Sequence, residues 1–142
     1  MDRFRKWHAA TWALLLGFAG SACDQKTTQS RLGDPALGAP THEEISFIER
    51  TVTMPAGSNP LVSYFRVYAR TVREGQTLVL GQYMMGAHFE REDRTIFREI
   101  SPSVFVVDEE NLPLVLDGGC DVVIVEYDAH LERVGAACSG VA

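Results

Sequence analysis

Residues 120–138 read CDVVIVEYDAHLERVGAAC, and this stretch decides the expected fold. Two runs rich in β-branched and small residues flank Asp128-Ala129-His130, whose residue types favour a turn. If the runs pair as antiparallel strands with Cys120 directly opposite Cys138, the two sulfur atoms lie within disulfide distance. We therefore predict a C-terminal hairpin with one disulfide, Cys120–Cys138. Two buried free thiols are the alternative.

Most of the chain just before this hairpin also has the residue pattern of strands. The first of these predicted strands follows a group of turn-forming residues at 73–76. Pro113 makes residues 112–116 either an edge strand or an extended loop, because proline donates no backbone hydrogen bond. The predicted strands cover residues 77–84, 87–90, 95–100 and 104–107, and 87–90 is expected to pair with 95–100 as a hairpin around 91–94.

Two helix signals lie earlier in the chain. Thr41 and Glu44 have the spacing of a capping box, and the apolar residues after them predict a helix near 42–52. A strand over 46–53 is the alternative. A second helix is predicted over 60–71, where apolar residues recur along one helical face: Leu61, Tyr64, Phe65, Tyr68 and Val72. The predicted fold class is therefore α+β, with two short N-terminal helices packed on a mainly antiparallel β-sheet.

The N-terminus has the order of regions found in an export signal. Basic residues in 1–6 are followed by an apolar run over 7–20 and then by Gly20-Ser21-Ala22, directly before Cys23. The apolar run is shorter than the roughly 20 residues that a spanning helix needs. We therefore expect a cleaved signal peptide, and an uncleaved membrane anchor is the alternative.

The small residues before Cys23 resemble the lipobox of bacterial lipoproteins. In that family the cysteine after the lipobox receives a diacylglycerol, which implies lipidation of Cys23. The position three before the cysteine is usually Leu in the family and is Gly20 here. Cleavage after Ala22 by the ordinary signal peptidase is the alternative. The remaining chain resembles small bacterial lipoproteins in its layout.

These features divide the chain into a signal peptide over 1–22, a tether over 23–40 and a single α+β domain over 41–142. The tether is expected to be flexible because it holds Gly, Pro, Ser and Thr with few large apolar residues. The formal net charge of the full chain is −6. Loss of Arg3, Arg5 and Lys6 with the signal makes the rest more acidic still. Nucleic acid and anionic lipid headgroups are therefore poor partners for the domain.

Candidate metal ligands are few. His42-Glu43 lacks the second histidine of a zinc-protease helix, because Ser46 stands at its position. His88, Glu90 and Asp93 could supply ligands for a metal, and a solvated surface is the alternative. A larger acidic group lacks the EF-hand spacing for calcium: Asp108, Glu109, Glu110, Asp117 and Asp121.

Nucleophilic catalysis has no sequence signature. The chain contains neither G-x-S-x-G nor S-x-x-K, so a triad built on His88 or His130 has no support. Tyr64, Phe65 and Tyr68 could line a ligand groove, but their spacing is more typical of a helix core. We predict no catalytic residue, no metal site and no cofactor.

The expected function follows from the export signal rather than from any chemical motif. We expect a lipid-anchored cell-envelope protein on the periplasmic side of a membrane, or one secreted to the periplasm. Its expected role is that of a non-enzymatic binding module, with the membrane as a partner through the lipid and an envelope protein as a further partner. The alternatives are a small periplasmic hydrolase or metal-dependent enzyme, and a structural subunit of an envelope assembly.

Overall fold

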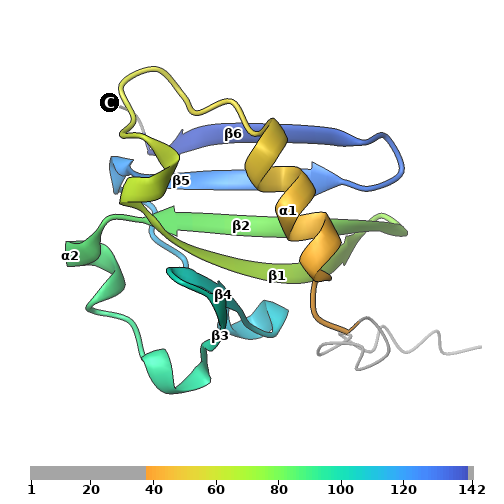
Figure 1. The fold of residues 1–142 in the computed structure, drawn as a ribbon, viewed down its shortest axis with the longest axis horizontal. Helices are drawn as coiled ribbons and strands as arrows, with labels where there is room; N and C mark the ends of the chain where they lie inside the picture. Colours follow the sequence, from red (N-terminus) through yellow and green to blue (C-terminus); the bar gives the residue numbers. More distant parts are fainter. Residues whose placement is uncertain (1–37, 141–142) are drawn as a thin grey trace, which may run out of the picture. The chain divides into compact units, whose positions relative to one another are not determined.

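Six strands form one mixed sheet in the order β3-β4-β1-β2-β5-β6 in the computed structural model, which describes residues 38–140 (Figure 1). Neighbouring strands run antiparallel except for β1 and β4, which are parallel. The architecture is therefore α+β and mainly antiparallel, as predicted. The strands are β1 (Phe65–Arg73), β2 (Gln76–Met84), β3 (Arg98–Ser101), β4 (Val104–Val106), β5 (Gly119–Asp128) and β6 (Arg133–Ser139).

The helix α1 (His42–Thr51) lies across one face of this sheet (Figure 1). The predicted capping box is present, because the Thr41 hydroxyl accepts from the Glu44 backbone N–H at 3.2 Å and the Glu44 carboxylate accepts from the Thr41 N–H at 2.7 Å. Ile45 and Ile48 are buried against the sheet, and the Phe47 ring lies 5.4 Å from that of Tyr127. The predicted helix is confirmed, and the alternative strand over 46–53 is wrong.

The predicted second helix over 60–71 is wrong. Only Leu61–Ser63 is helical, as the single 3-10 turn η1, and β1 begins at Phe65. The strand lies between β2 and β4 in the sheet, and both of its faces are covered. Tyr68 belongs to the core beneath α1, whereas Val67 belongs to the core on the opposite face. Apolar residues on both faces of one strand produced the helical spacing seen in the sequence.

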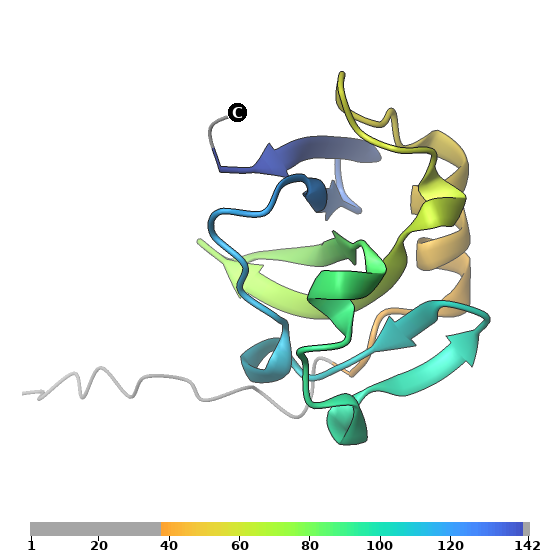
Figure 2. The ribbon, with the colours of Figure 1, turned by 90° about the vertical axis from the view of Figure 1, so that its left-hand side faces the viewer.

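The opposite face of the sheet is covered by the connections between strands (Figure 2). These connections contain the one-turn helix α2 (Gly86–Phe89) and two 3-10 turns, η2 (Arg94–Ile96) and η3 (Glu109–Asn111). The Phe89 ring is buried and stacks on Phe65 with 4.2 Å between ring centroids. The core on this face consists of Val67, Ala69, Met84, Phe89, Val107 and Val122.

The predicted hairpin between 87–90 and 95–100 is also wrong. The Phe89 N–H donates to the Met85 carbonyl at 3.1 Å, so this part of the chain is helical and directs the Phe89 ring into the core. The Asp93 carboxylate then accepts from the Thr95 N–H at 3.0 Å and closes a turn. The strand that follows, β3, pairs with β4 instead. Side-chain burial and a local cap therefore override strand pairing here.

The C-terminal hairpin and its disulfide are confirmed, but the predicted register is wrong. Cys120 and Cys138 are bonded with 4.5 Å between their Cα atoms, yet the residue directly opposite Cys138 is Val123. A bulge between Gly119 and Val123 explains both facts. The Asp121 N–H donates to the Gly118 carbonyl at 3.2 Å, and this turn brings Cys120 back beside its partner.

Two connections between strands, the turn at 73–76 and the segment 112–116, have conformations that the sequence predicted. Glu74 and Gly75 both have positive φ, as a two-residue turn between β1 and β2 requires. Residues 112–116 form an extended loop and not a strand, which was one of the two predicted outcomes. The loop is tied to the back of the sheet, because Ser139 Oγ donates to the Val115 carbonyl.

Candidate functional site

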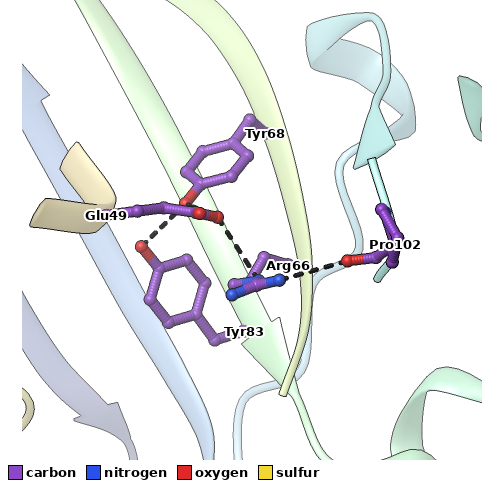
Figure 3. A network of polar contacts seen from close by, with 5 residues as sticks. All are labelled: Glu49, Arg66, Tyr68, Tyr83 and Pro102. Atoms are coloured by element: carbon purple, nitrogen blue, oxygen red, sulfur yellow. Dashed lines mark hydrogen bonds and ion pairs between the residues drawn. The ribbon is translucent and has the colours of Figure 1, made fainter. Parts of the chain in front are cut away.

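A polar network lies in the interior between α1 and the sheet (Figure 3). The Glu49 carboxylate is 3.3 Å from Arg66 Nε and accepts from the Tyr68 hydroxyl at 3.3 Å. The Tyr68 and Tyr83 hydroxyls are hydrogen-bonded at 2.9 Å. Arg66 also donates to the Pro102 carbonyl at 3.3 Å, which ties the network to the β3–β4 turn. The helix and two parts of the sheet are thus joined through buried polar groups.

Both tyrosines of this network are fully buried and neutral. Burial raises the pKa of Tyr68 and of Tyr83 far above the ordinary range of a phenol. Neither hydroxyl therefore ionises at physiological pH, and each serves as a hydrogen-bonding group. Tyr68 and Tyr83 are buried and bond to each other and to Glu49, as polar groups with a structural role in a core do.

A second ion pair fixes the first turn of α1. Glu44 contacts Arg70 of β1, and both side chains are largely buried. Burial alone raises the pKa of Glu44, but the hydrogen bonds from Arg70 and Thr41 outweigh it, so the pKa lies below the ordinary value of a carboxyl group. Glu44 therefore stays ionised in the folded protein and holds the start of α1 on the end of β1.

The disulfide is linked to the connection between α1 and β1. The Tyr64 hydroxyl donates to the Cys120 carbonyl at 2.6 Å and accepts from the Asn59 N–H at 2.9 Å. Cys120 Sγ also lies 3.7 Å from the Ala56 carbonyl oxygen. Tyr64 is itself buried. The aromatic residues Tyr64 and Tyr68 therefore belong to the core, and Phe65 packs on the other face, so the interpretation as a ligand groove loses its basis.

The candidate metal ligands are not brought together. His88 lies in α2, and the Asp93 carboxylate is engaged by the hydroxyl and backbone N–H of Thr95. Those hydrogen bonds lower the pKa of Asp93. His42 occupies the exposed first turn of α1, and His130 lies in the turn between β5 and β6. Among residues 38–140, no three His, Cys, Asp or Glu side chains are arranged to hold a metal ion.

The acidic residues are divided between the two ends of the sheet. Glu109 accepts a hydrogen bond from the buried Thr71 hydroxyl, near the end of β1. Asp121 lies at the other end, where its carbonyl accepts from the Met85 N–H at 2.9 Å. Asp117 lies at the same end as Asp121, next to Gly140. The acidic group that looked compact in the sequence is therefore not one site.

An exposed apolar surface lies on the face of the sheet opposite α1. It consists of Leu114, Leu116 and Ile124, with exposed fractions of 78%, 65% and 43%, and we call it the back-face surface. The loop that carries both leucines is fixed in place. The Gln82 amide, with its nitrogen facing Pro113, donates to the Pro113 carbonyl and accepts from the Val115 N–H at 3.1 Å. Exposed apolar side chains on a fixed loop are typical of a protein-binding surface.

Sequence reasoning missed the back-face surface, although a signal was available. Residues 112–116 read LPLVL, and in an extended loop alternate residues face opposite sides. Pro113 is buried, so Leu114 and Leu116 point away from the sheet at the positions where solvent-facing polar residues are expected.

A shallow hollow of about 180 Å³ adjoins this face near the turn between β5 and β6. It is lined by Glu126, Asp128, Leu131, Arg133 and Gly135. Arg73 Nη1 lies 3.6 Å from Glu126 Oε2 in the same region, and both side chains are more than half exposed. The hollow is open and carries charges of both signs, and it lies at the start of β6, away from Leu116 at the other end of this strand.

Cys23, the predicted lipidation site, lies outside the described residues. Within residues 38–140, no helix has the length and apolar character needed to cross a membrane. Comparison of the chain with protein-family models, with curated proteins and with solved structures finds no match.

Proposed function

We propose that this chain is an exported, lipid-anchored cell-envelope domain that binds a partner protein through the back-face surface. The observation that carries the proposal is the Cys120–Cys138 disulfide. Disulfides persist in oxidising compartments such as the periplasm and are rare in the cytosol. A structural disulfide in the C-terminal hairpin therefore agrees with the export signal read over residues 1–23.

The direction in which the chain enters the domain also supports the proposal. Pro40 is buried and Thr41 caps α1, whose first turn pairs with Arg70 at the end of β1. Leu116 lies beside Gly140, where β6 finishes, at the opposite end of the sheet. β1 has nine residues, so the two ends are about 30 Å apart. Leu116 therefore lies far from the point at which the tether, anchored by a lipid on Cys23, would enter the domain.

The proposed role is binding and not catalysis. Among residues 38–140, the groups with a lowered or raised pKa serve structural purposes: Glu44 and Asp93 are caps, and Tyr68, Tyr83 and Tyr127 lie in the core. Groups that carry out acid–base chemistry have to reach a substrate from a cleft. The back-face surface is apolar and open instead, which suits association with apolar side chains of another protein.

Export and lipidation are tested by expressing the full chain in a Gram-negative bacterium. We expect fractionation to place it with the membranes, and mass spectrometry to find an N-terminal diacylated Cys23 and no free thiol at Cys120 or Cys138. A Cys23→Ser variant serves as the control and is expected to lose the lipid and the membrane association. Full-length protein that retains Met1 in the cytosol with reduced cysteines would overturn the proposal.

Binding is tested by placing a photo-crosslinking residue at Leu116 in the same cells. We expect a crosslinked adduct of discrete mass at Leu116. The matched control is Val62 in η1, which is also highly exposed at 83% but lies outside the back-face surface. Equal yields of the same adduct at both positions, or no adduct at Leu116, would contradict the assignment of this surface.

A further inference from the structure

The outer edge of β6 is open. The strand lies at one end of the strand order, and Figure 1 shows it at the margin of the sheet. Among residues 38–140, the backbone of β6 is hydrogen-bonded only to β5. Every second residue of an edge strand directs its N–H and C=O groups outward, so these groups are available to a further strand.

The two edges of the sheet differ in how well they are protected. β3, at the other edge, has four residues and begins with Arg98 and Glu99, and short charged edge strands resist pairing. β6 has seven residues, and its one charged residue, Arg133, stands at its start. The rest of β6 is small or apolar and contains no proline or lysine. It is therefore the edge that is suited to accept another strand.

We propose that β6 pairs with β6 of a second copy of this chain, in antiparallel orientation about a twofold axis. This inference rests on the proposed function, because lipid anchoring of both chains in one membrane brings their β6 edges together; pairing at that edge leaves the back-face surface of each copy uncovered. An axis through Ala136, the middle residue of β6, is the only symmetric register that pairs all seven residues. Arg133 then lies opposite Ser139 of the second copy, and Gly135 lies opposite Ala137.

Charge complementarity favours this register. Asp117 lies beside the end of β6, with its Oδ1 3.7 Å from the position that a Cβ atom on Gly140 would occupy. Arg133 of the second copy would lie opposite Ser139, which precedes Gly140, the residue beside Asp117. Because of the twofold symmetry, the contact between Arg133 of one copy and Asp117 of the other forms twice. A parallel pairing would instead bring the two Arg133 side chains together, which like charges oppose.

The residues at the centre of this seam are small. Ile124 lies opposite Ala137 within the hairpin, and Gly135 and Ala137 are both exposed. Pairing across the axis places these small residues between the Ile124 side chains of the two copies. The two back-face surfaces would then lie on the same side of the joined sheet, with the half-exposed Glu126 side chain of each copy, which lies opposite Gly135, in the same row. Small residues at the centre permit the close approach that strand pairing needs.

The association should be weak in free solution. One seven-residue strand edge buries less than the roughly 1,200 Å² that stable complexes need. Two chains anchored in the same membrane are confined together, which raises their effective concentration. Lipid anchoring would therefore allow the weak pairing through β6 to occur at the membrane.

The register is tested by cysteine crosslinking of the full lipidated chain, reconstituted in lipid vesicles, with Cys23 retained in all variants because its sulfur carries the lipid and not a free thiol. Ala136→Cys places a thiol on the twofold axis, and Arg98→Cys at the β3 edge is the matched control. We expect mild oxidation to give a disulfide-linked dimer with Ala136→Cys, mapped by mass spectrometry to residue 136 in both chains. A yield no higher than that of Arg98→Cys would overturn the proposal.

The charge contacts are tested in the same vesicles. We expect Arg133→Glu and Asp117→Arg each to reduce the Ala136→Cys dimer about tenfold, since each alters two contacts. The double variant restores both contacts with reversed sign and should recover most of the yield. Reduction by both single variants without recovery in the double variant would contradict the register.

The inference and the proposed function can fail separately. Crosslinking from Leu116 to a different protein, with no dimer through residue 136, would overturn the inference and leave the envelope binding role intact. A cytosolic, reduced chain that still forms the residue-136 dimer would overturn the proposed function alone.

Discussion

At the scale of single residues, Glu44 has two roles at once. It completes the capping box of α1 and forms an ion pair with Arg70 of β1. Buried charges are tolerated where both partners are present, and the removal of one leaves the other without compensation. Glu44 and Arg70 are therefore the residues at which a small change should have a large effect on stability.

Replacement of Arg70 by methionine should destabilise the protein by about 2–4 kcal/mol, because it leaves the buried Glu44 carboxylate without a cation. The measurement is the free energy of unfolding from urea denaturation. The control is Arg73→Met on the same strand. Arg73 pairs with Glu126 through side chains that are more than half exposed, so we expect a change below about 1 kcal/mol. Equal effects of the two substitutions would contradict the importance of the buried pair.

The same carboxylate should make stability depend on pH. The pKa of Glu44 is lower in the folded protein than in the unfolded chain, where it is about 4.3. Its contribution is therefore complete above the unfolded pKa and is lost as the pH falls through the folded pKa. We expect Glu44→Gln to lower the unfolding free energy by about 1–2 kcal/mol at pH 7 and by progressively less below pH 4.

Urea denaturation of wild type and Glu44→Gln across this pH range checks the dependence. Glu43→Gln is the matched control, because Glu43 is an exposed neighbour in the same helical turn. We expect it to change stability by much less than Glu44→Gln at pH 7. A loss of stability in Glu44→Gln that stays constant down to pH 2 would show that the carboxylate is not engaged as described.

At the scale of elements, the C-terminal hairpin depends on its disulfide. Cys120 and Cys138 are 18 residues apart, and closure of a loop of this size stabilises a protein by roughly 3 kcal/mol in the chain-entropy estimate. We expect the double variant Cys120→Ser/Cys138→Ser to lose about this much in chemical denaturation. Wild type with its disulfide reduced should match the double variant. A change below about 1 kcal/mol in both would contradict a stabilising role.

The elements that were predicted correctly are those whose signals are local. Thr41 and Glu44 specify the start of α1 through contacts three residues apart, and Glu74 with Gly75 specifies a turn. β1 was misread as a helix because burial on both faces is decided by elements distant in the sequence. The disulfide was predicted although its register was not, because the turn at Gly118–Asp121 depends on backbone geometry that the residue types do not specify.

At the scale of the whole molecule, the folded part begins close to Pro40, the first buried residue of those described. We expect a chain that starts at Gly38 to unfold at the same urea concentration as the chain that starts at Cys23. A chain that starts at Ile45 lacks both the capping box and the Glu44–Arg70 pair, so it should lose about 3 kcal/mol or more. Equal stability of all three chains would contradict this boundary.

The candidate site could be predicted from sequence only in part. The disulfide was predicted because cysteines of exported proteins form disulfides in an oxidising compartment, whatever their positions in the sequence. The back-face surface was not found, because it combines Leu114 and Leu116 of a loop with Ile124 of β5. The position of the loop is set by the bonds that Gln82 and Ser139 make to residues 113 and 115. Such tertiary contacts leave no regular spacing in the sequence.

The strand order has a consequence for folding kinetics. β1–β2, β3–β4 and β5–β6 each join neighbours in sequence, whereas β1–β4 and β2–β5 join distant segments. Contacts between distant segments form late, because their closure costs more entropy. The β1–β2 pair takes part in both of these late steps, so it should be the nucleus of the transition state. Stopped-flow measurements should find that substitutions in the β1–β2 turn slow refolding, whereas substitutions in β6 mainly accelerate unfolding.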